Sequence, residues 1–473
     1  MQFKATIYIV VTLIPFILVF ACTSDSMVKE NSNRPDTAIN TLRIHPINPR
    51  YFTDKSGKAI YLTGSHTWYN IHSSPGGLIP TYNDFEKYLD FMQSYGHNFV
   101  RLWTGFSYLG CEPYPWNRPG PGTAFDGKPK FDMTSFNKGY FDMLRERVLQ
   151  IQKRGMYCSV MFFGSHNKMK RNFNEVAWHP FNNINTALAK AFDVNNGYSF
   201  FTTHPEALEI QRKLVRKFID ELNDMDNLIW EIINEPGGRP EAVKWHKEMI
   251  NYVKLYESTK PKQHLVGMGG GWQLYQQMLS SSADWISPDW DEYHQGGPAG
   301  YSEKIVINDT DHLRPWGGAK ESEAENMRKW VWKTFLRGNH PIFMDSYDAY
   351  VPELNNYGTI NHAFNGVRNA MGYTRIYANK INLSETVPSD DGYICSTKYC
   401  LYKLGSEYLI YQPTSDAPFT VNLPGGTYIY EWFNPVIGKV SETGTLTVRV
   451  GGEKLFRAPF SGDAVLYLHA VND

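Results

Sequence analysis

A repeating pattern between residues 59 and 381 constrains the fold of this chain more than any other sequence feature. Short runs of apolar and β-branched residues end in polar residues or glycine, and most are followed by a segment with apolar residues at helical spacing. Eight such runs favour a closed (β/α)₈ TIM barrel, an α/β fold, over an open doubly wound sheet. The expected strands are 60–64, 99–103, 157–163, 228–233, 264–268, 285–288, 304–307 and 341–344.

The segments between these strands carry helix signals. Thr81 precedes one such segment and Gly96 follows it, while Pro205 stands in the first turn of another. The expected helices are 81–95, 140–153, 204–222, 242–256, 323–336 and 363–379. No glycine-rich dinucleotide fingerprint or phosphate loop follows the first strand, which argues against nucleotide-binding folds.

The regions on either side of the barrel follow other patterns. Residues 1–21 are expected to form an export signal, since one lysine precedes an uncharged apolar run. Residues 22–41 are mostly polar and are expected to form a flexible tether. The barrel, with an N-terminal hairpin, is expected to span 42–385. Short alternating segments then predict a small β-sandwich over 386–473.

The segment Val19-Phe20-Ala21-Cys22 resembles a bacterial lipobox. The resemblance implies that Cys22 becomes the lipidated first residue of an exported, membrane-anchored lipoprotein, on the periplasmic or surface face of an outer membrane. The alternative is an uncleaved signal anchor. The apolar run of 17 residues contains Pro15 and is short for a membrane span of about 20 residues.

Composition excludes some classes of partner. The chain has 47 basic and 48 acidic residues, so it lacks the excess of positive charge that is typical of nucleic-acid-binding proteins. Aromatic residues make up 15% of the chain, so that rings are available either for a large core or for flat, sugar-like ligands. The cysteines are too few for a disulfide scaffold, although Cys395 and Cys400 could bridge across a hairpin.

The chemistry of a barrel lies at the carboxyl ends of its strands, where side chains converge on one mouth. The fourth run ends in Asn234-Glu235-Pro236, which places Glu235 at the last strand position. Glu231, four residues earlier, is expected to point inward at a lower level. Arg101, on the second strand, is expected to point inward and to hold a carboxylate ionised and oriented.

The seventh run continues into Asn308-Asp309-Thr310-Asp311. Strand length puts Asp309 at the mouth, and Asp311 faces the same way two positions later. Asp345, at the end of the eighth strand, is a third candidate, with a structural ion pair as its equally weighted alternative. Two carboxyls in unlike surroundings, one protonated and one ionised, are what glycosidic bond cleavage requires.

Other polar and aromatic side chains follow these strands and are expected to line the mouth and contact substrate. No zinc-binding spacing supports a metal site among the histidines. We expect hydrogen-bonding lining roles instead, and neither a metal nor another cofactor. The lining candidates, besides Asn234, Arg101 and Asp345, are His66, Trp68, Trp103, His166, Tyr293 and His294.

On these motifs, most of residues 42–385 resembles clan A of the glycoside hydrolases. The resemblance implies that Glu235 is the proton donor, that Asn234 binds a sugar hydroxyl, and that Arg101 lies beneath the nucleophile. It also implies retention of anomeric configuration. The clan's second carboxylate is usually glutamate, whereas this chain offers Asp309 or Asp311.

Two further motifs narrow the resemblance. The opening Arg-Tyr-Phe-x-Asp pattern reads Arg50-Tyr51-Phe52-Thr53-Asp54, and Gly64 precedes Trp68 by four residues, both as in the apiosidase-like group. That group does not share this Asn-Glu-Pro. Residues 430–438 resemble the collagen-binding-type β-sandwich appended to some of these hydrolases, for which a supporting role is expected rather than collagen binding.

The sequence therefore predicts a lipid-anchored, exported, retaining glycoside hydrolase. Its expected substrates are oligosaccharides or polysaccharide fragments from plants or algae, cleaved with two carboxylates. Two alternatives stay open. One is a non-catalytic glycan-binding lipoprotein on a barrel scaffold, favoured by the missing glutamate on the seventh strand. The other is an inverting hydrolase or a lyase.

Overall fold

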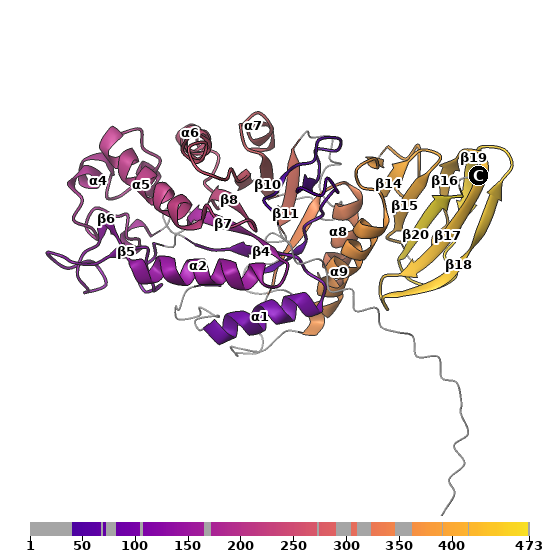
Figure 1. The fold of residues 1–473 in the computed structure, drawn as a ribbon, viewed down its shortest axis with the longest axis horizontal. Helices are drawn as coiled ribbons and strands as arrows, with labels where there is room; N and C mark the ends of the chain where they lie inside the picture. Colours follow the sequence, from indigo (N-terminus) through magenta and orange to yellow (C-terminus); the bar gives the residue numbers. More distant parts are fainter. Residues whose placement is uncertain are drawn as a thin grey trace, which may run out of the picture. The chain divides into compact units, whose positions relative to one another are not determined.

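The computed structural model describes residues 40–67, 70–71, 82–104, 107–164, 172–271, 274–289, 304–309, 323–345, 362–389, 391–414 and 416–471. Its main feature is an eight-stranded parallel sheet that curls into a barrel, with helices on the outside of the strands (Figure 1). The strand order is β3-β12-β11-β10-β9-β8-β7-β4. The bounds are β3 Gly64–His66, β4 Phe99–Leu102, β7 Tyr157–Phe163, β8 Leu228–Ile233, β9 Val266–Gly271, β10 Trp285–Asp289, β11 Ile305–Asp309 and β12 His340–Met344.

These elements confirm the predicted (β/α)₈ architecture. The strands predicted at 157–163 and 228–233 have the observed bounds. The first strand differs most, because only Gly64–His66 joins the barrel sheet, whereas Ile60 forms an isolated bridge to Phe52. The main helices are α1 Tyr82–Ser94, α2 Lys138–Gln152, α5 Pro205–Leu222, α6 Pro240–Glu257, α8 Ala324–Leu336 and α9 Asn365–Lys380. Two short helices, α4 Thr186–Ala191 and α7 Tyr275–Leu279, were not predicted.

The barrel closes where β3 meets β4. The Asn98 side chain accepts a hydrogen bond from Thr63 N at 2.9 Å and donates to Tyr61 O at 2.8 Å. At Gly64 the two backbones are so close that a Cβ would lie 2.0 Å from Phe99 O. Only glycine therefore fits this position without a shift of the backbone.

The interior of the barrel is apolar at its lower level and polar at its upper level. Buried side chains from seven strands or their lead-ins fill the lower level, among them Leu62, Phe99, Tyr157, Ile229, Trp285, Ile305 and Ile342. Gly267 leaves room for the Trp285 ring, since a Cβ there would lie 2.0 Å from a ring carbon. Because side chains alternate along a strand, the next inward positions of β4 and β8 carry Arg101 and Glu231, whereas Asp309 and His66 lie one inward position beyond Ile307 and Gly64.

A short hairpin precedes the barrel, and antiparallel strands follow it. In the hairpin, β1 Arg43–Ile44 pairs with β2 Phe52–Thr53. Figure 1 shows the antiparallel strands gathered into one unit in yellow and light orange. One sheet has the order β13-β14-β15-β20-β17-β18, and β16 pairs with β19. The bounds are β13 Val387–Ser389, β14 Cys400–Lys403, β15 Glu407–Gln412, β16 Phe419–Leu423, β17 Gly426–Asn434, β18 Lys439–Val448, β19 Gly452–Phe456 and β20 Ala464–Ala470.

This antiparallel unit is the predicted β-sandwich, with its own buried cluster around Tyr408, Ile410 and Trp432. Cys395 and Cys400 are buried there as free thiols, so the bridge considered from the sequence is not formed. The sandwich packs on the barrel helices through a buried Arg328–Asp463 pair with two contacts of 2.7 Å. In the described ranges no helix is long and apolar enough to cross a membrane.

Candidate active site

Asp309, the last residue of β11, is the centre of the polar upper level. Its Oδ2 accepts hydrogen bonds from Arg101 Nη1 at 2.6 Å and from His66 Nε2 at 2.9 Å. Burial raises the pKa of this carboxyl, but the interactions with His66 and the Arg101 guanidinium outweigh burial and lower the pKa to about 2. Asp309 is therefore ionised at neutral pH. Its Oδ1 has no hydrogen-bond partner within the described ranges.

His66 is held in one tautomer. The indole Nε1 of Trp103, which is only a donor, lies 2.9 Å from Nδ1 of His66. Nδ1 must therefore accept, which leaves the proton of the neutral ring on Nε2, where it is donated to Asp309. The Trp103 backbone is itself fixed, because its N–H donates to Oδ1 of Asn70 at 3.1 Å. Trp103 thus acts on the carboxylate through His66.

Arg101 joins three acceptor residues, Glu231 and Asn234 from β8 and its end and Asp309 from β11. Its Nε donates to Glu231 Oε2 at 3.0 Å, and its Nη2 contacts Glu231 Oε1 and donates to Asn234 Oδ1 at 3.0 Å. Both the guanidinium and the Glu231 carboxylate are buried. The inward, lower placement predicted for Glu231 is confirmed. A buried carboxylate opposite a bidentate guanidinium fixes the plane of Arg101, and so aims Nη1 at Asp309.

Gly269 and Ser159 complete the surroundings of this pair and were missed in the sequence. A Cβ at Gly269 would lie 3.4 Å from Glu231 Oε1, an ordinary van der Waals contact, so β9 passes directly beside the carboxylate. Ser159 Oγ lies 3.4 Å from Glu231 Oε2. The sequence features that could have identified them are a glycine within a strand and a serine at an inward position of an otherwise apolar strand.

Glu235 lies two residues beyond β8, which ends at Ile233. The sequence placed it at the last strand position, but the strand ends earlier because the backbone turns at Glu235, which has a φ of +47°. A non-glycine residue in this left-handed region costs roughly 1–3 kcal/mol and concentrates at functional sites. Glu235 is half-buried, whereas the preceding Asn234 is buried and bound to Arg101.

Asp345 has a different environment from Asp309. Its two carboxylate oxygens accept hydrogen bonds from Arg368 Nε at 2.8 Å and Nη2 at 2.6 Å. Both side chains are fully buried, and Arg368 belongs to α9 on the outside of the barrel. This arrangement is that of a structural ion pair, the alternative considered from the sequence.

The remaining predicted residues lie outside the described ranges. These are Cys22, Trp68, His166, Tyr293, His294 and Asp311. Of the predicted site, the structure brings together His66, Arg101, Trp103, Asn234 and Asp309, with Glu235 adjacent to Asn234 in the chain.

Comparisons with known proteins identify which of them share this fold. A family described as "Domain of unknown function (DUF6298)" matches residues 96–284, which include Arg101 and Glu235 but end before Asp309. A solved structure described as "Glycoside hydrolase" is 15% identical, covers 92% of this chain and 98% of its own, and has a TM-score of 0.61. A glycoside hydrolase family 5 structure from Bacteroides vulgatus ATCC 8482 gives the same identity and TM-score, covering 92% and 95%.

The fold is shared with glycoside hydrolases. At 15% identity the likeness shows the barrel and its appended sandwich, and the chemistry has to be argued from the site residues. The comparison with curated proteins gave no significant match.

Proposed function

We propose that this protein is a retaining glycoside hydrolase that cleaves glycosidic bonds in plant or algal polysaccharide fragments. The observation that carries the proposal is Asp309, a strand-end carboxylate held ionised by Arg101 and His66. Glu235 follows β8 at the same end of the barrel in a strained backbone conformation. One ionised carboxylate and a second, separately positioned carboxyl are the components that this reaction requires.

In the first step, Asp309 is the nucleophile. Its Oδ1 attacks the anomeric carbon while the bond from that carbon to the leaving oxygen breaks and Glu235 gives its proton to that oxygen. The products are a free alcohol and a glycosyl ester on Asp309. The assignment of Oδ1 follows from its geometry, because Oδ2 already accepts hydrogen bonds from Arg101 and His66.

In the second step, the Glu235 carboxylate takes a proton from water as the water oxygen attacks the anomeric carbon. The ester bond breaks, the sugar is released and Asp309 is ionised again. Arg101 and His66 stabilise this departing carboxylate, since both donate to Oδ2, which shares the returning negative charge with Oδ1 by resonance. We assign Asn234 a hydrogen bond to a sugar hydroxyl beside the scissile bond, with its amide oriented by Arg101.

The proposal is tested with a panel of 2,4-dinitrophenyl glycosides, whose leaving group needs no proton. Glu235→Ala is expected to keep the first step but slow the second by roughly 10²- to 10⁴-fold, with azide restoring turnover as a glycosyl azide. Asp309→Asn is expected to lose both steps. Glu241→Gln, which alters an exposed carboxylate at the start of α6, is the matched control and should behave as the wild type.

Other outcomes identify the alternatives. Binding of glycans by the wild type without release of any sugar would identify a non-catalytic glycan-binding protein, for which the aspartate on the seventh strand is the supporting feature. An initial product of inverted anomeric configuration would identify an inverting hydrolase, and an unsaturated product would identify a lyase. Either result would remove Asp309 from the role of nucleophile.

We also propose that the chain is exported and anchored to a membrane through acylated Cys22, on the basis of its resemblance to a lipobox. Metabolic labelling with an alkyne fatty acid should mark the wild type and leave Cys22→Ala unlabelled. Equal labelling of the two proteins would contradict the anchor.

A further inference from the structure

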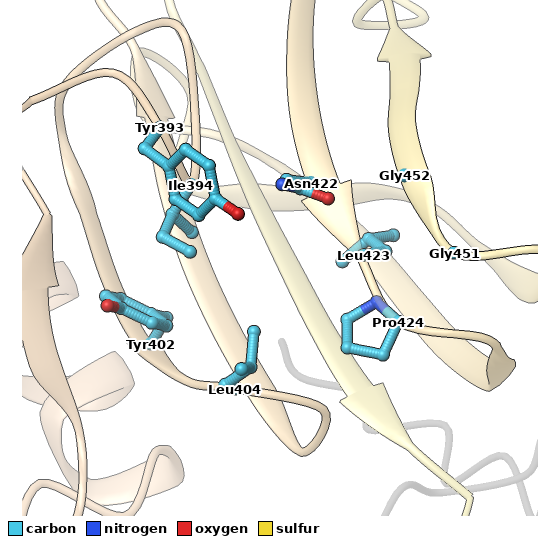
Figure 2. Close-up of a pocket in the computed structure, with 9 residues that line it drawn as sticks. All are labelled: Tyr393, Ile394, Tyr402, Leu404, Asn422, Leu423, Pro424, Gly451 and Gly452. Carbon is cyan, nitrogen blue, oxygen red and sulfur yellow. The ribbon is translucent and has the colours of Figure 1, made fainter.

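The β-sandwich carries a pocket of its own, with a volume of about 430 Å³. Figure 2 shows it between the end of β14, the end of β16 and the start of β19. This volume lies in the range of small-ligand sites, which is roughly 300–1,000 Å³. The nine lining residues are Tyr393, Ile394, Tyr402, Leu404, Asn422, Leu423, Pro424, Gly451 and Gly452.

None of these nine side chains is charged, yet three of them are polar. In the part of the chain that the structure describes, the hydroxyls of Tyr393 and Tyr402 and the side-chain amide of Asn422 form no hydrogen bond within the protein. In Figure 2 the Tyr393 hydroxyl and the Asn422 amide point toward the same space. Two hydroxyls and one amide are therefore available to a ligand as neutral donors and acceptors.

The apolar part of the pocket is open to solvent. Tyr393 is 71% exposed and Leu404 is 63% exposed. Gly451 and Gly452 contribute backbone only, which keeps one wall flat. An exposed aromatic ring beside unpaired hydroxyl and amide groups offers both a stacking surface and polar contacts.

The frame of the pocket is fixed before any ligand arrives. Tyr393 N donates to Asp391 Oδ1 at 2.9 Å, and Asn422 N donates to Ile394 O at 2.8 Å. The turn that carries Leu404 is held by a hydrogen bond of 2.8 Å from Gly405 N to the Tyr408 hydroxyl. A ligand would therefore bind without the cost of ordering these loops.

From these contacts we infer that the pocket is a second, non-catalytic binding site for a neutral saccharide. The hydroxyls of a sugar match the unpaired groups of Tyr393, Tyr402 and Asn422, and its C–H face matches the exposed tyrosine ring. An acidic sugar would lose hydration of its carboxylate on binding, and the uncharged lining offers no cation to compensate for that loss. This inference goes beyond the proposed hydrolysis and holds whether or not the barrel is catalytic.

The test uses the full chain carrying Glu235→Gln, so that any hydrolysis is suppressed, in native gels that contain a soluble polysaccharide. The neutral probes are galactomannan, xyloglucan and hydroxyethylcellulose, and polygalacturonate is the acidic probe. The binding variant adds Tyr393→Ala and Asn422→Ala, two positions with enough exposure for the fold to tolerate them. Leu455→Ala, an exposed apolar residue of β19 outside the pocket, is the control.

At least one neutral probe is expected to retard the parent and the Leu455→Ala control equally. In the binding variant the dissociation constant should rise about tenfold, or ~1.4 kcal/mol. Polygalacturonate should not distinguish the parent from the variant. If the wild type hydrolyses none of the substrates but the gels still show this pattern, the inferred binding site stands and the proposed function is rejected.

Equal retardation of parent and binding variant would assign all sugar binding to the barrel and overturn the inference. Absence of retardation by every neutral probe would also overturn it. Self-association of the parent in sedimentation, lost in the binding variant, would show that the pocket instead receives a second copy of the chain.

Discussion

The indole N–H of Trp103 donates to Nδ1 of His66 at 2.9 Å, and this contact decides which nitrogen of His66 faces Asp309. Without the indole donor, the neutral ring is free to carry its proton on Nδ1. Nε2 would then present a lone pair to the carboxylate, and one of the two donors to Asp309 Oδ2 would be lost.

Trp103→Phe is therefore expected to lower kcat about tenfold with little change in KM, since the loss of one hydrogen bond to a charged group costs roughly 1.5–3 kcal/mol. The acidic limb of the pH–rate profile should move upward, because Asp309 becomes easier to protonate. If the role of Trp103 is purely structural, Trp103→Phe will lower the free energy of unfolding and leave the pH–rate profile unchanged. Kinetics between pH 3 and 8, with thermal unfolding of the same variant, separate the two roles.

The low pKa of Asp309 links this carboxylate to stability. Its pKa of about 2 in the folded protein lies below the ordinary value of 3.8. The stabilisation is therefore fully present above pH 3.8 and is lost as pH falls through 2, and it amounts to roughly 2 kcal/mol. Asp309→Asn removes this dependence.

The measurement is urea unfolding of wild type and Asp309→Asn between pH 5 and pH 2. The free-energy difference between the two proteins should shift by roughly 2 kcal/mol in favour of Asp309→Asn over this range. Asp193→Asn, at an exposed loop position, serves as the control. A difference that stays constant with pH would mean that Arg101 and His66 do not hold the carboxylate ionised.

Closure of the barrel depends on Gly64. Because a Cβ would lie 2.0 Å from Phe99 O, Gly64→Ala forces β3 and β4 apart and is expected to cost about 1–3 kcal/mol of unfolding free energy or more. Gly139→Ala, at an exposed position in the first turn of α2, should be neutral or slightly stabilising. Denaturant unfolding of both variants checks the contrast, and equal stability would contradict close contact at the seam.

Much of this fold was predictable from the sequence because its periodicity is local. The strands at 157–163 and 228–233 are mostly apolar runs, and helices such as α5 carry a start signal, here Pro205, and one apolar face. The roles of Gly64 and Asn98 in closing the barrel were not recognised, because they depend on how closely two strands approach rather than on any nearby pattern.

The site was predictable in its residue types but not in its contacts. Asn-Glu-Pro after a strand pointed to Glu235, and strand length pointed to Asp309. The alternation of side chains could place Glu231 inward, but could not show that Arg101 bridges Glu231 and Asp309. The sequence could not decide between a site role and a structural ion pair for Asp345, because its partner Arg368 lies 23 residues away on α9.

His246 offers a test of buried polar groups away from the candidate active site. It lies on α6 and is fully buried, and neither ring nitrogen has a hydrogen-bond partner in the described ranges. Burial lowers its pKa from 6.5 to about 3, so the folded protein keeps the ring neutral. As pH falls below 6.5 the unfolded chain takes up a proton that the folded chain does not, and stability declines until pH 3.

His246→Leu removes both the unpaired nitrogens and this proton uptake. The variant is expected to be more stable than the wild type at pH 7, with an additional gain of about 2 kcal/mol at pH 5. The comparison is made by denaturant unfolding at both pH values, with His469→Leu as a control, since the His469 side chain is 48% exposed. A gain at pH 7 that does not grow at pH 5 would mean that His246 takes up its proton in the folded protein. A loss at both values would mean that the imidazole makes a favourable contact that leucine cannot replace.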